Sequence, residues 1–308
     1  MKKEWFASII VCISFLFCLC FKDEIVNVVM KKYIHYKTID APKANSYYME
    51  RDFELVKRTN DFHINNYQDI LDIIYTILDN GSIEFTFYCD ESYGQCVNDF
   101  DKVSQDQVLL STINNMVSPY NSYKKVYFKR TSYGEITMKI DRLYSDEDVR
   151  LVNEKIDSFI NSNINDSMSM RDKIKAFHDY LINNSIYDKE RASIIENGGE
   201  TGFSNSHKAI GPLVDGLSLC SGYSDAMKIF LDKLGIANYK ISNSRHIWNL
   251  VYIDGSWLHL DLTWDDPITN DGENLLLYSF FLIDTDAFLK LDSEGHTFNP
   301  DYYKELSH

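Results

Sequence analysis

The sequence has few positive charges for its length. Its 31 lysine and arginine residues are outnumbered by 46 aspartate and glutamate residues, which gives a net charge of −15. Because binding to a phosphate backbone requires a basic surface, this balance argues against nucleic acid as a partner. The chain also lacks internal repeats and low-complexity linkers, so the length beyond its first residues is available for ordinary folded domains.

Patterns typical of metal sites are missing as well. Cys89 and Cys96 do not have the spacing of a zinc knuckle, and no paired histidines follow them. The acidic residues between Asp265 and Glu273 do not match a calcium-binding EF-hand loop, and ordinary turn chemistry explains them. We therefore expect neither a metal nor a cofactor.

The amino terminus contains the longest apolar run. Lys2 and Lys3 precede the uncharged residues 5–21, which would span ~26 Å as a helix, close to the ~30 Å of a bilayer core. This pattern is typical of a secretion signal or an uncleaved signal anchor, and we favour the anchor because Cys18-Leu-Cys20 is a poor cleavage site. We expect residues 1–24 to form this segment and the rest of the chain to lie at the cell surface or to be secreted.

The cysteines fit an exported protein. Three of the six lie in the apolar run, namely Cys12, Cys18 and Cys20. Cys89 and Cys96 flank a short segment and are predicted to form a disulfide in an oxidising compartment. Only Cys220 is then left as a candidate for chemistry.

Cys220 is expected in the first turn of an amphipathic helix. Apolar side chains follow it at spacings of three and four up to Leu234, and Gly235 fits a helix C-terminus. Ser218 or Ser221 is the expected N-cap. Free N–H groups and the helix dipole favour a thiolate at that end, although many free cysteines are only packed and inert.

Residues 246–263 are predicted to form a β-hairpin with Asp254-Gly255 as its two-residue turn. Pairing Ile253 with Ser256 places His246 opposite Thr263 and puts His246 and Asp261 on one face, within reach of each other. A three-residue loop would put them on opposite faces. The other face is aliphatic and is expected to pack into the core.

These residues suggest an acyl-transfer site. Cys220 would attack a carbonyl, His246 would move the proton, and Asp261 would orient the imidazole. The Cys220 backbone N–H would stabilise the oxyanion. Candidates for further oxyanion or substrate contacts are Ser206, His207, Lys208, Tyr223 and Trp248. His259 shares the polar face and competes as the base, but we favour an ordinary strand histidine.

The ordered motifs Cys220-Ser-Gly-Tyr, His246-Ile-Trp-Asn, Asp254-Gly-Ser-Trp and Asp261-Leu-Thr-Trp-Asp-Asp-Pro resemble the bacterial transglutaminase-like family. The resemblance runs from residue 209 to residue 282 and extends upstream to the helix around His178. It implies a papain-like thiol fold with these three residues as the triad. It leaves the reaction open, because the superfamily includes transglutaminases, amidases, peptidases and proteins that have lost catalysis.

Two details lie outside the shared motifs. Ile247 stands where the family often has alanine, which would narrow the site beside the base. The late His296-Thr-Phe is similar to a late histidine that is common in the family, and we assign it a structural role.

The expected fold class is α+β. A small α+β domain at residues 25–143 would contain helices 67–78 and 105–116, the latter capped by Ser104, and strands 83–89, 125–130 and 135–140. The catalytic domain at residues 144–308 would begin with helix 147–161, capped by Ser145, and helix 168–183. Its core would be the cysteine-bearing helix packed on an antiparallel sheet that carries His246 and Asp261.

The expected function is that of an extracytoplasmic thiol hydrolase, a peptidase or amidase, that acts on surface proteins or peptides. A cross-linking transamidase and a catalytically silent binding module are the alternatives.

Overall fold

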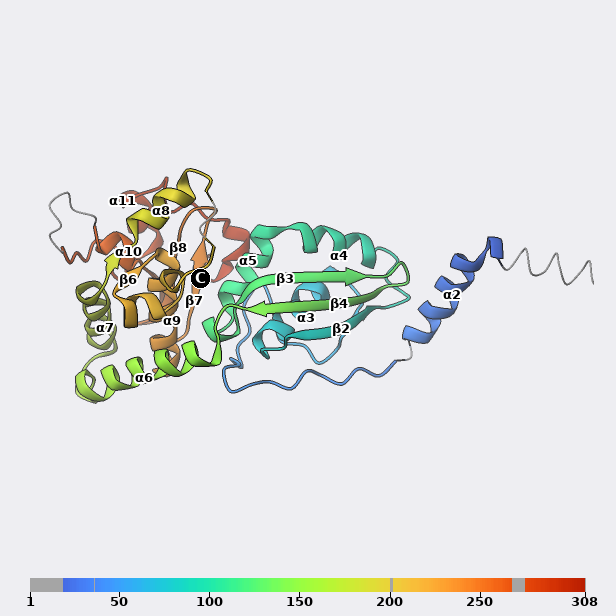
Figure 1. Ribbon diagram of the computed structural model, residues 1–308, viewed down its shortest axis with the longest axis horizontal. Coiled ribbons are helices and arrows are strands. Elements are labelled where there is room, and N and C mark those ends of the chain that lie inside the picture. Colours follow the sequence, from blue (N-terminus) through green and yellow to red (C-terminus); the bar gives the residue numbers. More distant parts are fainter. Residues whose placement is uncertain (1–18, 36, 200–201, 268–274, 308) are drawn as a thin grey trace, which may run out of the picture.

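The computed structural model describes residues 19–35, 37–199, 202–267 and 275–307, and its fold is mixed α+β (Figure 1). Most of the predicted signal segment, residues 1–18, lies outside the described residues. The first described helix, α2 (Lys22–His35), extends away from the body of the protein (Figure 1). Within the described ranges, none of the helices combines the length and the apolar character that a membrane crossing needs.

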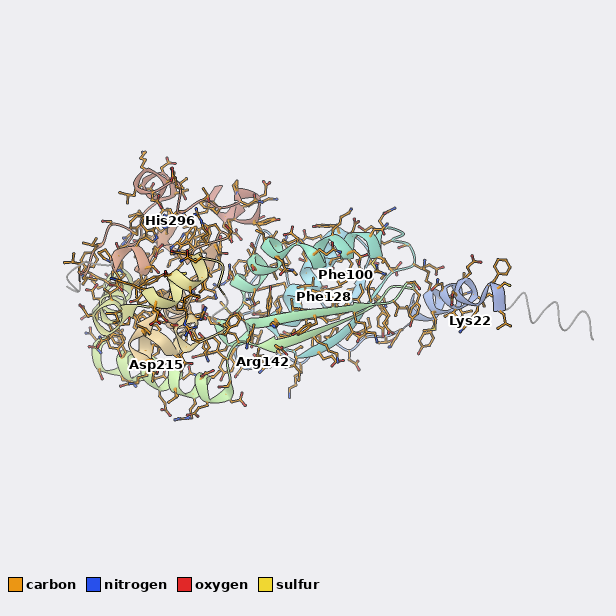
Figure 2. All side chains as sticks on the ribbon, turned by 45° about the horizontal axis from the view of Figure 1, so that its top comes forward. Lys22, Phe100, Phe128, Arg142, Asp215 and His296 are labelled. Carbon is orange, nitrogen blue, oxygen red and sulfur yellow. A yellow bond between two sulfur atoms is a disulfide. The ribbon has the colours of Figure 1, made fainter. Side chains whose placement is uncertain are left out.

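The amino-terminal half contains a four-stranded sheet in the order β1-β2-β4-β3. Its strands are β1 (His63–Ile64), β2 (Glu84–Cys89), β3 (Tyr123–Arg130) and β4 (Glu135–Arg142). Alternate residues of β4, such as Ile136 and Met138, are buried, which leaves the other face of the sheet more exposed. The helices of this half are α3 (Tyr67–Asp79), α4 (Cys96–Gln105) and α5 (Gln107–Met116). Their apolar side chains share a core with the sheet, in which Phe100 meets Phe128 (Figure 2).

A helix is predicted over residues 105–116 with Ser104 as its cap, and α5 covers Gln107–Met116 of that range. The predicted cap is wrong, because Ser104 and Gln105 belong to α4 and the two helices meet at Asp106, whose backbone is extended. The Asp106 carboxylate accepts a hydrogen bond from the Leu109 N–H at 2.9 Å and so caps α5. An aspartate favours this capping position over the interior of a helix, which explains the break.

A disulfide joins Cys89 at the end of β2 to Cys96 at the start of α4. This is the pair expected from the sequence, and its two sulfur atoms close a short loop with a sequence separation of 7. The bond ties the end of β2 to the start of α4.

Replacing both Cys89 and Cys96 by alanine is expected to lower the free energy of unfolding by ~2–3 kcal/mol, because a closed loop of this size restricts the unfolded chain. Urea denaturation followed by circular dichroism measures the change. The unreduced wild-type protein and the same protein reduced with dithiothreitol are the controls. Equal stability of the oxidised wild type and the double variant would show that the bond does not contribute.

The carboxy-terminal half begins with two capped helices. Ser145 caps α6 (Asp146–Asn163), as expected, and Ser169 caps α7 (Met170–Asn184).

The chain then forms β5 (Ile186–Tyr187), α8 (Lys189–Glu196), the turns η2 (Asn205–His207) and η3 (Gly211–Asp215), β6 (Leu217–Ser218) and α9 (Cys220–Lys233). An antiparallel sheet follows, made of β7 (Asn238–Ser242), β8 (Ile247–Ile253) and β9 (Ser256–Leu260), and then α10 (Leu262–Asp265) and α11 (Thr285–Leu291). Short 3₁₀ turns complete the described chain: η1 (Pro119–Asn121), η4 (Pro300–Tyr302) and η5 (Lys304–Ser307).

The sheet β7-β8-β9 is buried on both faces. On one face Val251 and Leu260 belong to a core that they share with α6, α7 and α9. On the other face Trp248 and Leu250 join the core of the amino-terminal half. The aliphatic face packs into the core, as predicted, and the face that carries Trp248 and His259 is buried as well, since both side chains pack against Phe288 of α11. The boundary predicted between residues 143 and 144 falls just before α6, and a single core includes residues from both sides of it.

Candidate functional site

Helix α9 begins at Cys220, and the pairing of β6 with β5 fixes the backbone just before it. Ser218 of β6 lies opposite Tyr187 of β5 in a parallel register. Leu219 is the N-cap, with extended backbone and no side-chain cap. The expected serine caps are therefore wrong, because the Ser218 hydroxyl donates to the Leu219 carbonyl instead. Cys220 is half-buried and is not in a disulfide. No side chain caps the N-terminus of α9, so the free N–H groups of its first turn lie beside the thiol.

His246 connects this thiol to a buried carboxylate. Its Nε2 lies 2.5 Å from Oδ2 of Asp261, which is 1% exposed. The Cys220 thiol is near enough to this imidazole ring to help raise its pKa. Because Nε2 faces Asp261, Nδ1 is the ring nitrogen that remains for the sulfur.

The hairpin places His246 and Asp261 with the expected turn but a shorter second strand. Ile253 pairs with Ser256, as predicted. β9 ends at Leu260, however, so the expected ladder pair of His246 with Thr263 does not form. Asp261 instead becomes the N-cap of α10, and its Oδ1 accepts from the N–H groups of Thr263 at 2.9 Å and Trp264 at 3.2 Å. This cap fixes the carboxylate while Oδ2 stays available to the ring.

Charge and burial act in opposite directions on this pair. Burial lowers the pKa of His246, but the charge of Asp261, its hydrogen bond to the ring and the nearby Cys220 thiol outweigh burial and raise the pKa to about 10. Burial raises the pKa of Asp261, and the attraction and hydrogen bonds of His246 and His296 outweigh it, so that this pKa lies well below its usual range. At neutral pH the site therefore contains an imidazolium held by an ionised carboxylate.

A second histidine, His296, contacts the same carboxylate. Its Nε2 lies 3.0 Å from Asp261 Oδ2 and its Nδ1 lies 3.0 Å from Asp292 Oδ2. The side chain is fully buried, and its ring packs against Trp264 and Phe288. His296 therefore holds Asp261 in place in addition to packing in the core, a contact that is compatible with the structural role assigned from sequence. The spacing of Asp292 and His296 could have suggested their own contact, but no local pattern links them to Asp261.

His246, Asp261 and His296 are, within the described ranges, the group of three that could hold a metal ion. Two ligand atoms on a tetrahedral zinc ion, each ~2.1 Å from the metal, lie ~3.4 Å apart. The separations here are 2.5 and 3.0 Å, which are those of direct hydrogen bonds. We therefore assign the cluster to the orientation of His246 and not to a cation.

Tyr187 is a further residue near Cys220 that sequence reasoning missed. Its register opposite Ser218 places it beside the strand that leads into α9. Burial raises the pKa of the Tyr187 phenol, and the negative charges of Cys220 and of nearby carboxylates raise it further. The phenol therefore stays protonated at neutral pH. The phenol is thus a hydrogen-bond donor on the strand that pairs with the segment leading to Cys220. Nothing in its immediate sequence distinguishes it, since only the β5-β6 pairing brings it there.

Of the five expected oxyanion or substrate contacts, two are wrong. Tyr223 lies on the buried stripe of α9, and its hydroxyl donates to Asp266 Oδ2 at 2.7 Å. Trp248 is buried against Phe288, and its Nε1 donates to His259 Nδ1 at 3.0 Å. Its ring stacks on that of His246, so it supports the imidazole rather than meeting a substrate.

The other three lie on or beside η2, next to α9, and their side chains have other partners. The Ser206 hydroxyl donates to Asp188 at 2.7 Å, and Lys208 Nζ lies 2.7 Å from an oxygen of Asp148. His207 Nδ1 contacts Ser204, and burial lowers its pKa. The Ser206 carbonyl accepts from the Leu219 N–H at 2.8 Å, so this segment fixes the start of α9.

His259 is a packed strand histidine, as favoured from sequence. Burial lowers its pKa to about 3, so the ring is neutral. It stacks on Phe288 with ring centres 4.1 Å apart and accepts the Trp248 hydrogen bond. It lies in the core behind His246 and does not compete as a base.

Comparison with known proteins gives little beyond this geometry. No protein-family model matches the chain, and no curated protein matches it. A solved structure described as "Crystal structure of a TGase" is similar to part of the chain, with a TM-score of 0.35 and 19% sequence identity. The similarity covers 46% of this chain and 44% of that chain, so less than half of the neighbour's length is matched. A similarity this weak does not establish the family of the chain.

Proposed function

We propose that the protein is a transglutaminase-like thiol enzyme that acts on amide bonds, with Cys220, His246 and Asp261 as its catalytic triad. The observation that carries the proposal is the position of the His246 ring, which is hydrogen-bonded to a buried, capped carboxylate and lies near enough to Cys220 for the thiol to raise its pKa. A packed, inert cysteine would need neither partner. The sequence motifs around these three residues support the family assignment.

The chemistry follows from the two protonation states of His246. The Cys220 sulfur attacks the amide carbon, and a tetrahedral oxyanion forms. The C–N bond then breaks as the imidazolium gives its proton to the departing amine, which leaves a thioester. In hydrolysis the neutral ring next takes a proton from water as the water oxygen adds to the thioester carbonyl, and the C–S bond then breaks, which releases the carboxylic acid and restores the Cys220 thiolate beside the imidazolium. Asp261 holds the ring and balances its charge throughout.

The Tyr187 phenol is the side chain that we assign to the oxyanion, together with the Cys220 backbone N–H. Tyr187→Phe removes one donor and should lower kcat by ~10²-fold. Alkylation of Cys220 by iodoacetamide forms no oxyanion, so its rate should stay within ~2-fold of wild type. If the rates of turnover and of alkylation fell equally, Tyr187 would stabilise the Cys220 thiolate rather than the oxyanion.

Hydrolysis is the reaction that we favour, and cross-linking is the alternative. Which nucleophile resolves the thioester depends on how well the site excludes water and guides an amine. A glutamine-containing peptide and a fluorescent primary amine, followed together with ammonia release, separate the two. Ammonia without labelled peptide supports hydrolysis, and labelled peptide supports transamidation. If Cys220→Ala protein gives the same signals as wild type, the proposed catalytic role is wrong.

We further propose that the enzyme works outside the cytoplasm on surface proteins or peptides, tethered by its amino-terminal segment. The disulfide between Cys89 and Cys96 supports an oxidising compartment. The apolar run at residues 5–21 supports a signal or anchor, and the net charge of −15 argues against nucleic acid. Thiol labelling of intact and lysed cells that express the full chain would test this. Labelling of Cys220 only after lysis would contradict the location.

A further inference from the structure

Strand β3 lies at an edge of the amino-terminal sheet and, among the described strands, pairs with β4 alone. The helices of this half do not cover that edge. Phe100 of α4 meets Phe87 of β2 with ring centres 6.1 Å apart and Phe128 of β3 with ring centres 5.3 Å apart (Figure 2). Because β2 and β3 lie on either side of β4, a ring that touches both places α4 over the face of the sheet and not beside β3.

The register of the β3–β4 hairpin shows which backbone groups face outward. The Thr131 N–H donates to the Glu135 carbonyl at 2.9 Å, and in an antiparallel ladder the hydrogen-bonded pairs then recur at every second residue. The odd-numbered residues of β3 therefore bond to β4, and the N–H and C=O groups of Val126 and Phe128 face the edge. Within the described part of the chain, no hydrogen bond reaches these groups from the edge side. Such groups are a template for one more strand.

The exposed face of β3 is basic. Lys125, Tyr127 and Lys129 alternate along this face and are all exposed, Tyr127 by 51%. Neither lysine forms an ion pair with a described residue, although Asp141 lies opposite Lys125 in the ladder. This stretch contrasts with the net charge of −15 of the whole chain. The lysines would repel the same edge of a second copy, whereas they would attract a chain of opposite charge.

The other face of β3 offers apolar contacts. Val126 and Phe128 pack against the core that the sheet shares with the helices, yet both are only part-buried, because no strand lies on their outer side. A strand added there would cover them. Since side chains alternate between the two faces of a strand, the added chain would need acidic side chains on one face and apolar ones on the other.

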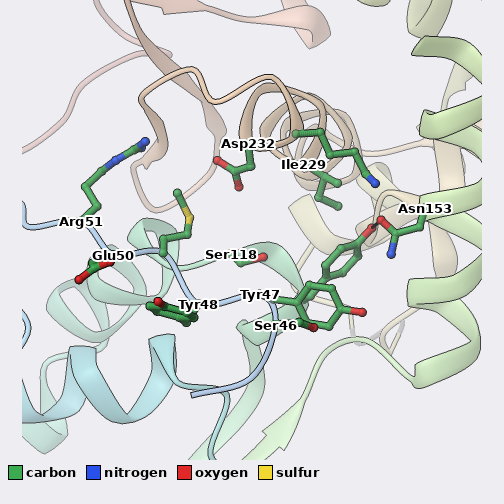
Figure 3. Close-up of a pocket in the computed structure, with 12 residues that line it drawn as sticks. Ser46, Tyr47, Tyr48, Glu50, Arg51, Ser118, Asn153, Ile229 and Asp232 are labelled. Atoms are coloured by element: carbon green, nitrogen blue, oxygen red, sulfur yellow. Dashed lines mark hydrogen bonds between the residues drawn. The ribbon is translucent and has the colours of Figure 1, made fainter. Parts of the chain in front are cut away.

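The start of β3 is fixed to the catalytic half. The turn η1 precedes it, and the Tyr120 hydroxyl of η1 donates to Asn153 of α6 at 3.2 Å, at a cavity between the two halves (Figure 3). Lys124 Nζ lies 5.3 Å from the ring centre of Phe203, in the segment that leads to η2. The edge is thus held in place, and one of its ends lies against the half that carries Cys220.

We propose that the edge of β3 binds an extended acidic segment of a partner protein as one more antiparallel strand. Acidic side chains of the partner lie beside Lys125 and Lys129, and apolar ones lie beside Val126 and Phe128. The antiparallel direction continues the pairing of β3 with β4 and is the slightly more stable of the two. This binding goes beyond the proposed acyl-transfer function and does not depend on whether Cys220 is reactive.

A fluorescein-labelled peptide, Gly-Glu-Val-Thr-Val-Glu-Gly, tests the proposal by fluorescence anisotropy with the full-length Cys220→Ala protein. Its valines fit opposite Val126 and Phe128, and it should bind saturably with Kd of ~10–500 μM. N-methylation of both valines removes the donors to β3 without changing the charge, so it should weaken binding at least ~10-fold. N-methylation of the threonine, whose N–H faces away from β3, is the matched control and should change Kd by less than ~3-fold.

Charge is tested on the protein. The double variant Lys125→Glu/Lys129→Glu should weaken binding at least ~10-fold. Lys155→Glu/Lys290→Glu makes the same change in net charge at exposed lysines of α6 and α11, and it should keep Kd within ~3-fold of wild type.

The two N-methylated peptides are compared on one and the same protein, so loss of folding in a variant does not decide the outcome. No saturable binding up to ~0.5 mM protein would overturn the proposal. Equal weakening by the two N-methylations would overturn it as well, because the backbone of β3 would then not be the binding element. Binding of Gly-Lys-Val-Thr-Val-Lys-Gly as tight as that of the acidic peptide would refute the selection by charge.

Discussion

His246→Ala should reduce turnover by on the order of 10⁴- to 10⁶-fold, because it removes both the proton carrier and the partner of the thiolate. It should also slow the alkylation of Cys220 by iodoacetamide at pH 7 to the rate of a simple model thiol. Both rates can be measured on the same preparation, with the labelled residue identified by mass spectrometry. The alkylation assay needs no knowledge of the substrate.

His207→Ala is the matched control, since His207 is also a partly buried histidine near α9 but contacts Ser204 rather than Cys220. It should keep alkylation within ~3-fold of wild type. Rapid alkylation that persists in His246→Ala would mean that the helix N-terminus alone activates Cys220. In that case the contact with His246 would have no catalytic meaning.

Local patterns were sufficient for the parts of the site that depend on neighbours in sequence. The Asp254-Gly255 turn fixes the register of Ile253 and Ser256, and this register brings His246 toward Asp261. The apolar stripe after Cys220 places the thiol at the start of α9. A turn and a stripe are short-range features, and short-range physical chemistry determines them.

Long-range contacts could not be predicted in the same way. His296 reaches Asp261 across 35 positions of sequence, and Tyr187 approaches Cys220 only because β5 pairs with β6. The hairpin face that carries Trp248 and His259 has the alternation expected of an exposed surface, yet α11 and the amino-terminal helices bury it. Such outcomes depend on which elements pack together, and the pattern within one strand does not contain that information.

The His246–Asp261 pair should also make stability depend on pH. Because the pKa of His246 is raised on folding, its contribution to the free energy of unfolding is complete below its ordinary pKa of 6.5. This contribution is lost as the pH rises through about 10. The lowered pKa of Asp261 means that its contribution is present above the ordinary value of 3.8 and is lost as the pH falls through the lower value. The two pKa shifts describe the same ion pair, so its stabilising effect on the fold is complete between about pH 4 and pH 6.5.

Asp261→Asn should lower turnover on the order of 10³-fold and move the pH profile of Cys220 alkylation. Asparagine keeps an oxygen that can cap α10 through Thr263 and Trp264, so the local fold should persist. It removes the charge that opposes burial, and the pKa of His246 should then fall from about 10 to below its ordinary value of 6.5. The alkaline limb of the alkylation profile, which reports loss of the imidazolium, should move down with it.

His296→Gln distinguishes charge from orientation at the same carboxylate. It removes one hydrogen bond to Asp261 but leaves the charge, so turnover should fall only ~10-fold and the alkaline limb should move by less than in Asp261→Asn. Rates measured from pH 5 to pH 11 on wild type and both variants give the comparison. An alkaline limb that stays in place in Asp261→Asn would show that Asp261 does not hold the proton on His246. The pair would then be a structural contact, and the catalytic assignment of Asp261 would fail.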